Sequence, residues 1–356
     1  MKKYINQDDM KNVNLIDVFN LIKELKQTTR KQIEAITKMS WGAVSNITAR
    51  LIERGLIVEC KAEKSNVPGR LPSYLMVNGN THYTIGLDIN MTGMKAELVN
   101  IKNDSVKTWK SNSNYSDKYT LMKCIVDFVQ KILSDTEDMQ IIGLGIAMQG
   151  IVDADNGISV KFPACDGWEN VKLAEILQNQ FNIPVWLEHD PNCILLAYSE
   201  NSTNHDAILL RIDRGIGMSL MLDGNIIGGM GMFEIGQTVI DGTTLEDHSS
   251  IIGMEKLYNK PFDVLVADAN SGNPSAIAVF DKMATHLATS IYNIQKIFNV
   301  SSVILCGEVM AHSNLFMDKI QHINSEIEFA EIDVNCASYG AAIIAVDKAI
   351  SLIKES

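Results

Sequence analysis

The amino-acid sequence predicts an α/β protein in two parts, a small helical head with a two-stranded wing and a larger body of two lobes. Residues 1–79 hold three closely spaced helical patterns followed by two short strands, and residues 80–356 hold a strand–acid–turn–strand unit twice. Charge changes at the same boundary. Residues 1–80 carry 13 Lys and Arg against 8 Asp and Glu, a net charge of +5, whereas the remainder carries 18 against 35, a net charge of −17. A basic head on an acidic body is expected when only one domain meets DNA.

The composition is that of a globular protein. The 356 residues suffice for two or three domains of about 100–200 residues each, and 46% are hydrophobic and 21% charged. No apolar run approaches the ~20 residues of a membrane span, and the polar start of the chain holds no secretion signal. The six cysteines form no CxxC pair. We therefore expect a cytoplasmic protein with free thiols and no membrane partner.

The three helical segments of the head are amphipathic. In the first, apolar residues recur on one helical face, at positions 15, 18, 19 and 22. The second spans residues 29–36, with Thr29 as the expected N-cap, and the third spans 41–53, with Ser40 in the same role. Because the second and third helices are separated by only a few residues, they form a candidate helix-turn-helix.

Two strands follow these helices and are expected to form a wing. Gly55 ends the third helix, and residues 56–60 and 71–77 are strands joined by a polar turn at Pro68-Gly69. In a helix-turn-helix the second helix of the motif enters the major groove. We expect the small and polar side chains between positions 40 and 48 to read base edges, namely Ser40, Ala43, Ser45, Asn46 and Thr48.

Basic residues of the head are expected to meet DNA phosphates, Arg50 from the third helix and Arg70 from the wing. The alternative is a helical bundle with a solvated basic face. The turn spacing, the wing and the local positive charge together favour the DNA-binding interpretation.

The body repeats one unit. Residues 83–89 form a strand that contains Asp88 near its end, and residues 94–100 form the next strand. A similar pair occurs at 207–213 and 218–224, and a later strand at 303–307 again ends in glycine. This repetition predicts a duplicated α/β domain with a cleft between its lobes. Lobe one is expected at about 80–200 plus 340–356, and lobe two at about 201–339. Glycine-containing turns of this kind suit phosphate binding.

Motifs along nearly the whole chain resemble those of the ROK family (repressor, open reading frame, kinase), in its xylose-repressor-like transcriptional regulator branch. The order and spacing of the pieces carry the resemblance, at residues 69–72, 143–153, 188–192, 215–217, 234–237 and 339–342. The resemblance implies a winged helix-turn-helix joined to a two-lobed actin-like ATPase (ribonuclease H-like) domain. It also implies operator DNA as one partner and a sugar or sugar phosphate as the effector.

The resemblance assigns roles to individual residues of the body. Asp190 matches the catalytic base of the family kinases, and His189 stands where Asn is usual. A simpler role for Asp190 is a helix N-cap ahead of Pro191. Trp168 could border the pocket or pack locally. The remaining expected sugar-pocket residues are Gln149, Gly150, Glu234, Gln237 and Glu255.

Three elements that bind ATP in the family are altered. Asn90 and Met91 stand where glycines let the phosphate approach, Arg214 replaces a small hydroxyl residue, and Glu308 brings negative charge to the third turn. Gln237 also replaces a zinc-binding His, and residues 242–255 contain no cysteine. We expect neither ATP nor metal to be used, and Asp190 to be a vestigial base.

These observations favour a sugar-responsive DNA-binding regulator, expected to repress carbohydrate-utilisation genes and to form a homodimer or homotetramer. Two alternatives stay open. One is an active sugar kinase with an accessory head, and the other is a constitutive DNA-binding protein whose pocket is vestigial.

Overall fold

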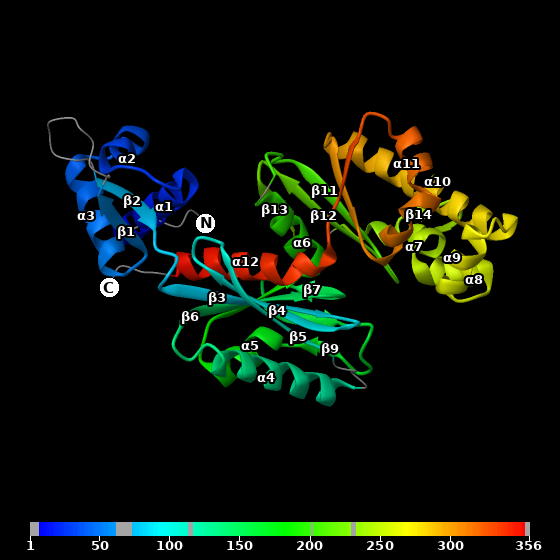
Figure 1. Cartoon of the computed structure of the whole chain (residues 1–356), viewed down its shortest axis with the longest axis horizontal. Helices are drawn as coiled ribbons and strands as arrows, with labels where there is room; N and C mark the ends of the chain where they lie inside the picture. The colour runs from blue at the N-terminus through cyan, green and yellow to red at the C-terminus, as the bar shows by residue number, and fades with distance from the viewer. Residues whose placement is uncertain (1–6, 62–72, 113–116, 201, 229–232, 353–356) are drawn as a thin grey trace.

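The computed structural model describes residues 7–61, 73–112, 117–200, 202–228 and 233–352. Within α1 and β1 the side chains of residues 7–14 and 61 are not described. Arg70 and the motif at 69–72 lie outside the described residues. The elements form an elongated molecule with the head at one end, lobe one in the middle and lobe two at the other end (Figure 1). The α/β class predicted from the sequence is confirmed.

The head contains three helices and a two-stranded wing. The helices are α1 (Gln7–Leu25), α2 (Arg30–Thr37) and α3 (Trp41–Glu53), and the antiparallel strands are β1 (Ile57–Lys61) and β2 (Ser73–Val77). Both expected N-caps are confirmed. The Thr29 side chain accepts from the backbone N–H of Gln32, which returns a bond to complete a capping box, and Ser40 accepts from the N–H of Ala43. The predicted apolar stripe of α1 is buried, at Leu15, Val18, Phe19 and Ile22.

Thr48 was expected to face DNA but is fully buried. Its hydroxyl donates to the Val44 carbonyl at 2.9 Å and accepts from Arg30 Nε at 2.9 Å. Both guanidinium Nη atoms of Arg30 then bind the carboxylate of Glu59 on β1, at 2.8 and 2.9 Å. Thr48 therefore joins α2, α3 and the wing instead of reading bases.

Lobe one is built on a five-stranded sheet in the order β10-β6-β3-β4-β5. Its strands β3 (His82–Asn90), β6 (Gln140–Met148) and β10 (Val185–His189) are parallel to one another, whereas β4 (Gly93–Asn100) and β5 (Ser105–Ser111) are antiparallel to their neighbours. The other elements of lobe one are α4 (Lys118–Ser134), α5 (Leu173–Phe181), α6 (Asp190–Ser199) and a small sheet of β7 (Ile151–Asp153), β8 (Ile158–Lys161) and β9 (Glu169–Val171).

Lobe two repeats this topology in the order β13-β12-β11-β16-β17. Its strands are β11 (Ala207–Ile212), β12 (Ile216–Leu222), β13 (Asn225–Ile227), β16 (Ser302–Cys306) and β17 (Glu328–Glu331), with a small hairpin of β14 (Val239–Ile240) and β15 (Thr243–Thr244). The helices of lobe two are α7 (Leu245–Ser249), α8 (Ile251–Tyr258), α9 (Phe262–Asn270), α10 (Pro274–Phe298) and α11 (Met317–Ile323). The predicted duplication is therefore present as two sheets with the same strand order and directions.

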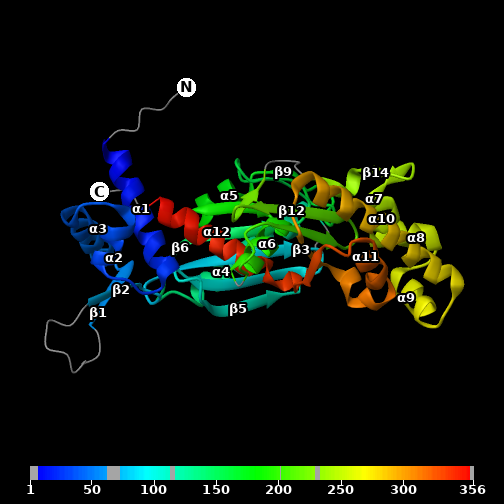
Figure 2. The same cartoon turned by 90° about the horizontal axis from the view of Figure 1, so that it is seen from above.

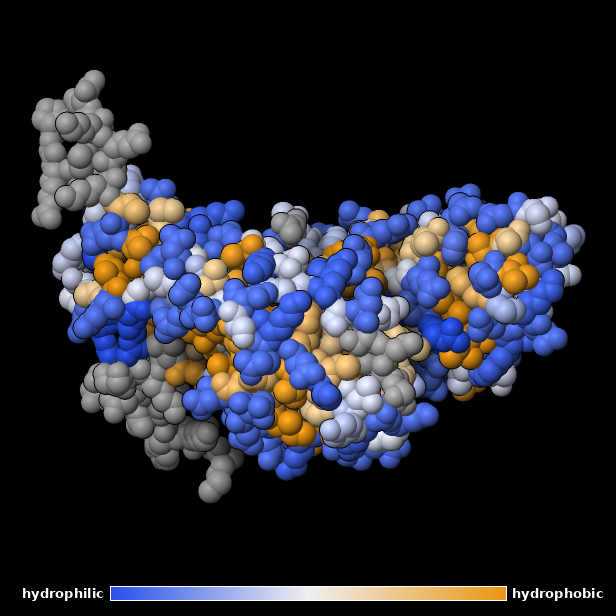
Figure 3. All heavy atoms as spheres, turned by 60° about the horizontal axis from the view of Figure 1, so that its bottom comes forward, coloured by the Kyte–Doolittle hydropathy of each residue, from blue (hydrophilic) through white to orange (hydrophobic). Residues whose placement is uncertain are grey.

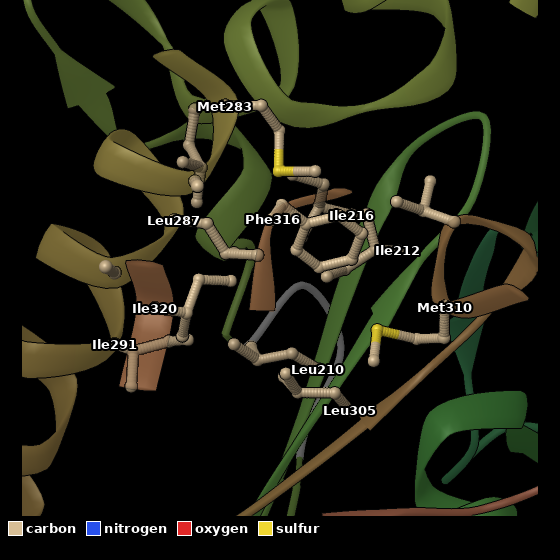
Figure 4. Close-up of a cluster of buried hydrophobic side chains, with 14 of the residues drawn as sticks. Leu210, Ile212, Ile216, Met283, Leu287, Ile291, Leu305, Met310, Phe316 and Ile320 are labelled. Atoms are coloured by element: carbon tan, nitrogen blue, oxygen red, sulfur yellow. The ribbon is translucent and has the colours of Figure 1, made fainter. Parts of the chain in front are cut away.

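Apolar side chains from the sheet of lobe two and from its helices form a shared core. Figure 4 shows Leu210, Ile212 and Leu305 of the sheet together with Met283, Leu287 and Ile291 of α10. Phe316 and Ile320 close the same cluster from the α11 side. Burial of this kind contributes about 25 cal/mol for each Å² of apolar surface and dominates the stability of the lobe.

Trp168 belongs to the core of lobe one, which corrects the expectation that it borders the pocket. Its side chain is 1% exposed, and its indole Nε1–H donates to Ser159 Oγ on β8 at 2.8 Å. A buried indole needs such a partner for its single donor. The local-packing alternative is correct, with the ring inside the protein.

The outer surface is mainly hydrophilic. Figure 3 shows hydrophilic residues over most of the visible face, with hydrophobic residues in patches between them. Among the described residues no helix has both the length and the apolar composition to span a bilayer.

The last helix, α12 (Ala337–Ser351), contacts all three parts of the molecule. Figures 1 and 2 show it running from between the lobes to the head. Near its start, Ala337 and Ala341 pack with α6 and with strands of lobe two, and near its end Val346 and Ile350 enter the core of the head. Lys23 of α1 adds an ion pair of 3.4 Å with Asp347.

Glycines allow this helix to lie unusually close to its neighbours. A β-carbon at Gly86 of β3 would overlap the Ser338 carbonyl oxygen, and one at Gly145 of β6 would overlap that of Ala341. Gly340 of α12 faces the carbonyl oxygen of Cys193 on α6 in the same way. Thr84 Oγ1 also donates to a backbone carbonyl of α12 at 2.9 Å.

Replacing Gly340 with Ala should destabilise the protein, because the new methyl group meets backbone that cannot move aside as a side chain can. We expect a loss of about 1–3 kcal/mol or more, measured by urea unfolding. Gly42→Ala in α3 is the matched control, because nothing lies within 4 Å of its β-carbon position. The control should be neutral or stabilising by up to about 1 kcal/mol. Equal effects of the two substitutions would refute the packing argument.

Candidate functional site

A pocket of about 560 Å³ lies between the two lobes. It is bounded on one side by the ends of β6 and β10 and the start of α6, and on the other by the β11–β12 turn and α7. Six of the expected ligand residues line it, namely Gln149, Gly150, His189, Asp190, Glu234 and Gln237. A smaller space of about 40 Å³ adjoins it and shares Gly150, His189 and Glu234.

Asp190 is the first residue of α6, so the position before it, His189, is the N-cap. The alternative role of Asp190 as the N-cap is therefore wrong. Pro191 follows at the start of the helix, where its missing N–H is not needed. This turn from strand to helix aims the Asp190 carboxylate at lobe two, and the side chain is almost completely buried.

Arg211 binds Asp190 across the cleft. Its Nη1 donates to Asp190 Oδ2, and its Nε donates to Asp213 Oδ2 at 2.6 Å. Asp213 Oδ1 in turn accepts from the backbone N–H of Glu308 at 2.5 Å. One guanidinium thus joins the start of α6 in lobe one to the end of β11 in lobe two.

Hydrogen bonds also link the lobes beside this ion pair. Glu188 Oε1 accepts from the His189 backbone N–H at 2.8 Å and from Asn192 Nδ2 at 2.9 Å. Asn192 Oδ1 accepts from the Ser219 hydroxyl of β12 at 2.6 Å. Glu188 and Asn192 also line the smaller space, so its wall is polar and held in place.

Burial controls the charge of several groups near the cleft. Burial, and then the charge of Arg211, lowers the pKa of His189 to about 4, so the imidazole is neutral at pH 7. Burial, followed by the carboxylate of Glu246, raises the pKa of Glu234 above its usual value. Burial likewise raises the pKa of Asp88 to about 6, although Arg211 acts in the opposite direction. A neutral imidazole and carboxylates at partly apolar positions suit hydroxyl groups as ligands.

The turn at residues 90–92 is the first of the three turns in which the sequence predicts a lost phosphate site. Its backbone N–H groups donate to side chains of the protein. Asn90 Oδ1 accepts from the backbone N–H of Thr92 at 2.9 Å, and the N–H of Met91 donates to Gln149 Oε1 at 3.2 Å. Asn90 Nδ2 donates to Asp88 at 2.8 Å. Backbone N–H groups of a phosphate-binding turn have to point at the anion. Here two of them are already bonded to side chains.

Glu255 does not line the cleft, which corrects its assignment as a sugar ligand. Its Oε1 accepts from the backbone N–H of Phe262 at the start of α9, at 3.0 Å, and its Oε2 lies 3.5 Å from Arg214. Arg214 does line the pocket. Glu255 is therefore linked to the pocket only through Arg214, and its other oxygen holds the start of α9.

Arg211 and Glu246 are among the lining residues that were not predicted from the sequence. Arg211 is the single charged residue of an otherwise apolar strand, and this signal could have marked it as functional. Glu246 Oε2 accepts from the Ile216 backbone N–H at 3.0 Å and fixes the second turn. Nothing local distinguishes Glu246 from the other acidic residues of its loop.

His248 of α7 and His286 of α10 form a histidine pair near the expected position of the family's metal loop. His248 is buried and accepts or donates a 2.8 Å bond with Thr243 Oγ1, and its ring stacks on His286 with centroids 4.1 Å apart. Burial is the main cause that lowers the pKa of His286. Among the described residues no group of three or more His, Cys, Asp or Glu side chains is placed to hold a metal.

A second candidate site is the outer face of α3. Ser40, Ala43 and Asn46 are exposed, and Ser45 and Arg50 are partly exposed. The opposite face of the helix, with Val44, Ile47 and Leu51, packs in the core of the head. The expected reading face is thus accessible except at Thr48.

Comparison with known proteins identifies relatives along the chain. The model of the ROK family matches residues 84–345. The xylose repressor of Caldicellulosiruptor bescii is 25% identical, with 91% of this chain and 90% of the relative aligned. The DNA-binding transcriptional dual regulator NagC of Escherichia coli is 23% identical over 89% of this chain and 85% of the relative.

Two similar solved structures differ in how much of this chain they cover. A ROK family transcriptional regulator, described as a homolog of the E. coli MLC protein, superposes with a TM-score of 0.81 over 97% of this chain and 98% of its own, at 16% identity. A ROK family glucokinase from Streptomyces griseus, in complex with glucose and AMPPNP, gives a TM-score of 0.60 over 74% of this chain and 99% of its own, at 18% identity. These likenesses show the fold. The match of the family model to well over half of the sequence shows that the chain belongs to the ROK family.

Proposed function

We infer that the chain is a sugar-responsive, DNA-binding transcriptional regulator that represses carbohydrate-utilisation genes. The observation that carries this is the extent of the structural match. The ROK glucokinase covers 74% of this chain, whereas the ROK regulator covers 97% and so includes the head. The repressor relatives likewise align over most of the chain.

The head supports the DNA-binding half of the proposal. An exposed face on the second helix of a helix-turn-helix is what major-groove reading requires. Ser45 and Asn46 offer hydrogen-bonding groups there, and Arg50 carries positive charge on the same helix. The proposed partner is operator DNA, bound by a homodimer or homotetramer because paired half-sites call for paired heads.

The cleft supports the sensing half of the proposal. Polar groups from both lobes converge on a space of about 560 Å³, which fits a monosaccharide or its phosphate. A ligand there changes DNA affinity only if it binds one lobe arrangement better than the other. Since α12 contacts both lobes and the head, it is the proposed route by which the arrangement reaches the head.

Sugar kinase activity is proposed to be lost. Arg211 already holds the Asp190 oxygen that would accept a proton from a sugar hydroxyl. Two backbone N–H groups of the first turn already donate to side chains, one to Asn90 within the turn and one to Gln149 after β6. Met91 also lines the pocket, where a glycine would leave room. Purified protein with ATP and hexoses, pentoses or amino sugars should release ADP at the uncatalysed rate. ADP release that Asp190→Asn abolishes would establish the kinase alternative instead.

The full chain should retard DNA from upstream of its own gene in a gel shift, and one sugar or sugar phosphate should weaken that binding. Asn46→Ala should reduce affinity about tenfold, because a good side-chain contact to a base is worth about 1–3 kcal/mol. Asn179→Ala, an exposed position on α5, is the matched control and should bind as the unaltered protein does. The proposal fails if no upstream fragment binds.

Removing Arg211 should strongly destabilise the protein, because it leaves the buried Asp190 carboxylate without its cation. Arg211→Met should lower the free energy of unfolding by about 3–5 kcal/mol. Adding Asp190→Asn to this variant should recover much of the loss, since the unpaired charge is then gone. Additive effects of the two substitutions in urea unfolding would show that the pair is not coupled.

A further inference from the structure

We propose that Trp41 sets part of the operator preference by contacting the methyl group of a thymine in the major groove. The inference rests on the proposed DNA-binding function and adds to it a residue and the chemical group that it recognises. It concerns the first turn of α3, which precedes Ser45 and Asn46, two residues expected to form hydrogen bonds with bases.

The exposure of Trp41 is exceptional among the tryptophans of the chain. Its side chain is 53% exposed, whereas Trp109 is 8% and Trp168 is 1% exposed. The two buried indoles also donate their N–H groups, to Asp135 at 2.8 Å and to Ser159 at 2.8 Å. Trp186 is half-buried and packs over the position of Gly143. Trp41 belongs to none of the hydrophobic core clusters of the described residues.

Its position places the ring at the leading end of the reading helix. Trp41 is the first residue of α3, directly after the N-cap Ser40. Gly42 and Ala43 follow, and no atom lies within 4 Å of the β-carbon position of Gly42. The indole is therefore the one large side chain of this first turn, and small neighbours leave it free to approach the floor of the groove.

The chemistry of this turn selects its partner. The side chains that follow the N-cap, Trp41, Gly42 and Ala43, present mainly apolar surface. In the major groove the apolar group is the thymine C5-methyl, and apolar side chains recognise it by contact. Ile36 near the end of α2 is also 53% exposed, so an exposed apolar side chain stands on each side of the turn at residues 38–40.

The test compares thymine with deoxyuridine, which differs only by the missing methyl group. A duplex that the unaltered full chain selects from a random-sequence pool is resynthesised with deoxyuridine at one thymine at a time. For the unaltered chain, one position per half-site should lose about fourfold in affinity, the worth of burying one methyl-sized group. Trp41→Ala should weaken binding to the thymine duplex by at least as much, and should show no further loss with deoxyuridine at that position.

Two controls separate this effect from folding and from general binding. Trp41→Ala should unfold at the same urea concentration as the unaltered chain, because the ring packs in no core. Tyr119→Ala removes an aromatic ring that is 78% exposed on α4 of lobe one, and should leave the thymine dependence unchanged. Indole emission quenched by iodide should become protected when the duplex binds, and Trp41→Ala should lose that protection.

The outcomes distinguish this inference from the function on which it rests. If the unaltered chain selects no duplex, both fail. If it binds but Trp41→Ala keeps the same affinity and the same response to deoxyuridine, DNA binding stands and the role of Trp41 is overturned. A Trp41→Ala protein that changes only its oligomeric state, with unchanged thymine dependence, overturns it equally.

Discussion

Close packing of backbone on backbone around α12 is the constraint on which the arrangement of the molecule depends. The helix can lie against β3, β6 and α6 only because three facing positions lack a β-carbon, at Gly86, Gly145 and Gly340. Interiors packed at this density transmit displacement rather than absorb it. The same helix carries Val346 and Ile350 into the core of the head. The head is therefore packed against the body rather than joined to it by a linker alone, since the two share one hydrophobic core.

Patterns within a few residues predicted the helices and caps of the head well. They failed to predict the burial of side chains whose partners lie far away in the sequence. The apolar stripe of α1 and the caps at Thr29 and Ser40 depend on neighbours a few residues away, and all were found. Thr48 lies beside the apolar stripe of α3, and its burial depends on Arg30, which is 18 positions earlier in the chain. Trp168 packs in the core of lobe one, and a hydrogen-bond acceptor on β8 satisfies its indole N–H there. No periodicity within one helix or loop carries that information.

In the cleft, too, the motifs predicted some residues of the site, whereas tertiary contacts determined others. Motif order brought Gln149, His189, Asp190 and Glu234 together correctly, because the fold fixes where each strand ends. It could not reveal Arg211, whose partner Asp190 lies on the other lobe and 21 positions away. Glu255 was predicted to line the pocket because its position in the motif order matched, but its tertiary contacts place it elsewhere. Its carboxylate holds the start of α9, and the acidic residue that lines the pocket is Glu246.

The ion pair between Arg211 and Asp190 gives the proposed sensor a physical basis for two arrangements. Both charges are largely removed from water, so separating them has a cost unless a ligand replaces the lost bonds. A polyhydroxylated ligand can do so, because its hydroxyl groups donate to carboxylates and accept from a guanidinium. Its binding energy then depends on how far apart the lobes stand, which is the differential affinity that a switch requires. In a kinase the same carboxylate has to stay open to its substrate. The proposed change from catalyst to sensor thus combines this arginine on the facing strand with the altered turns and needs no change of fold.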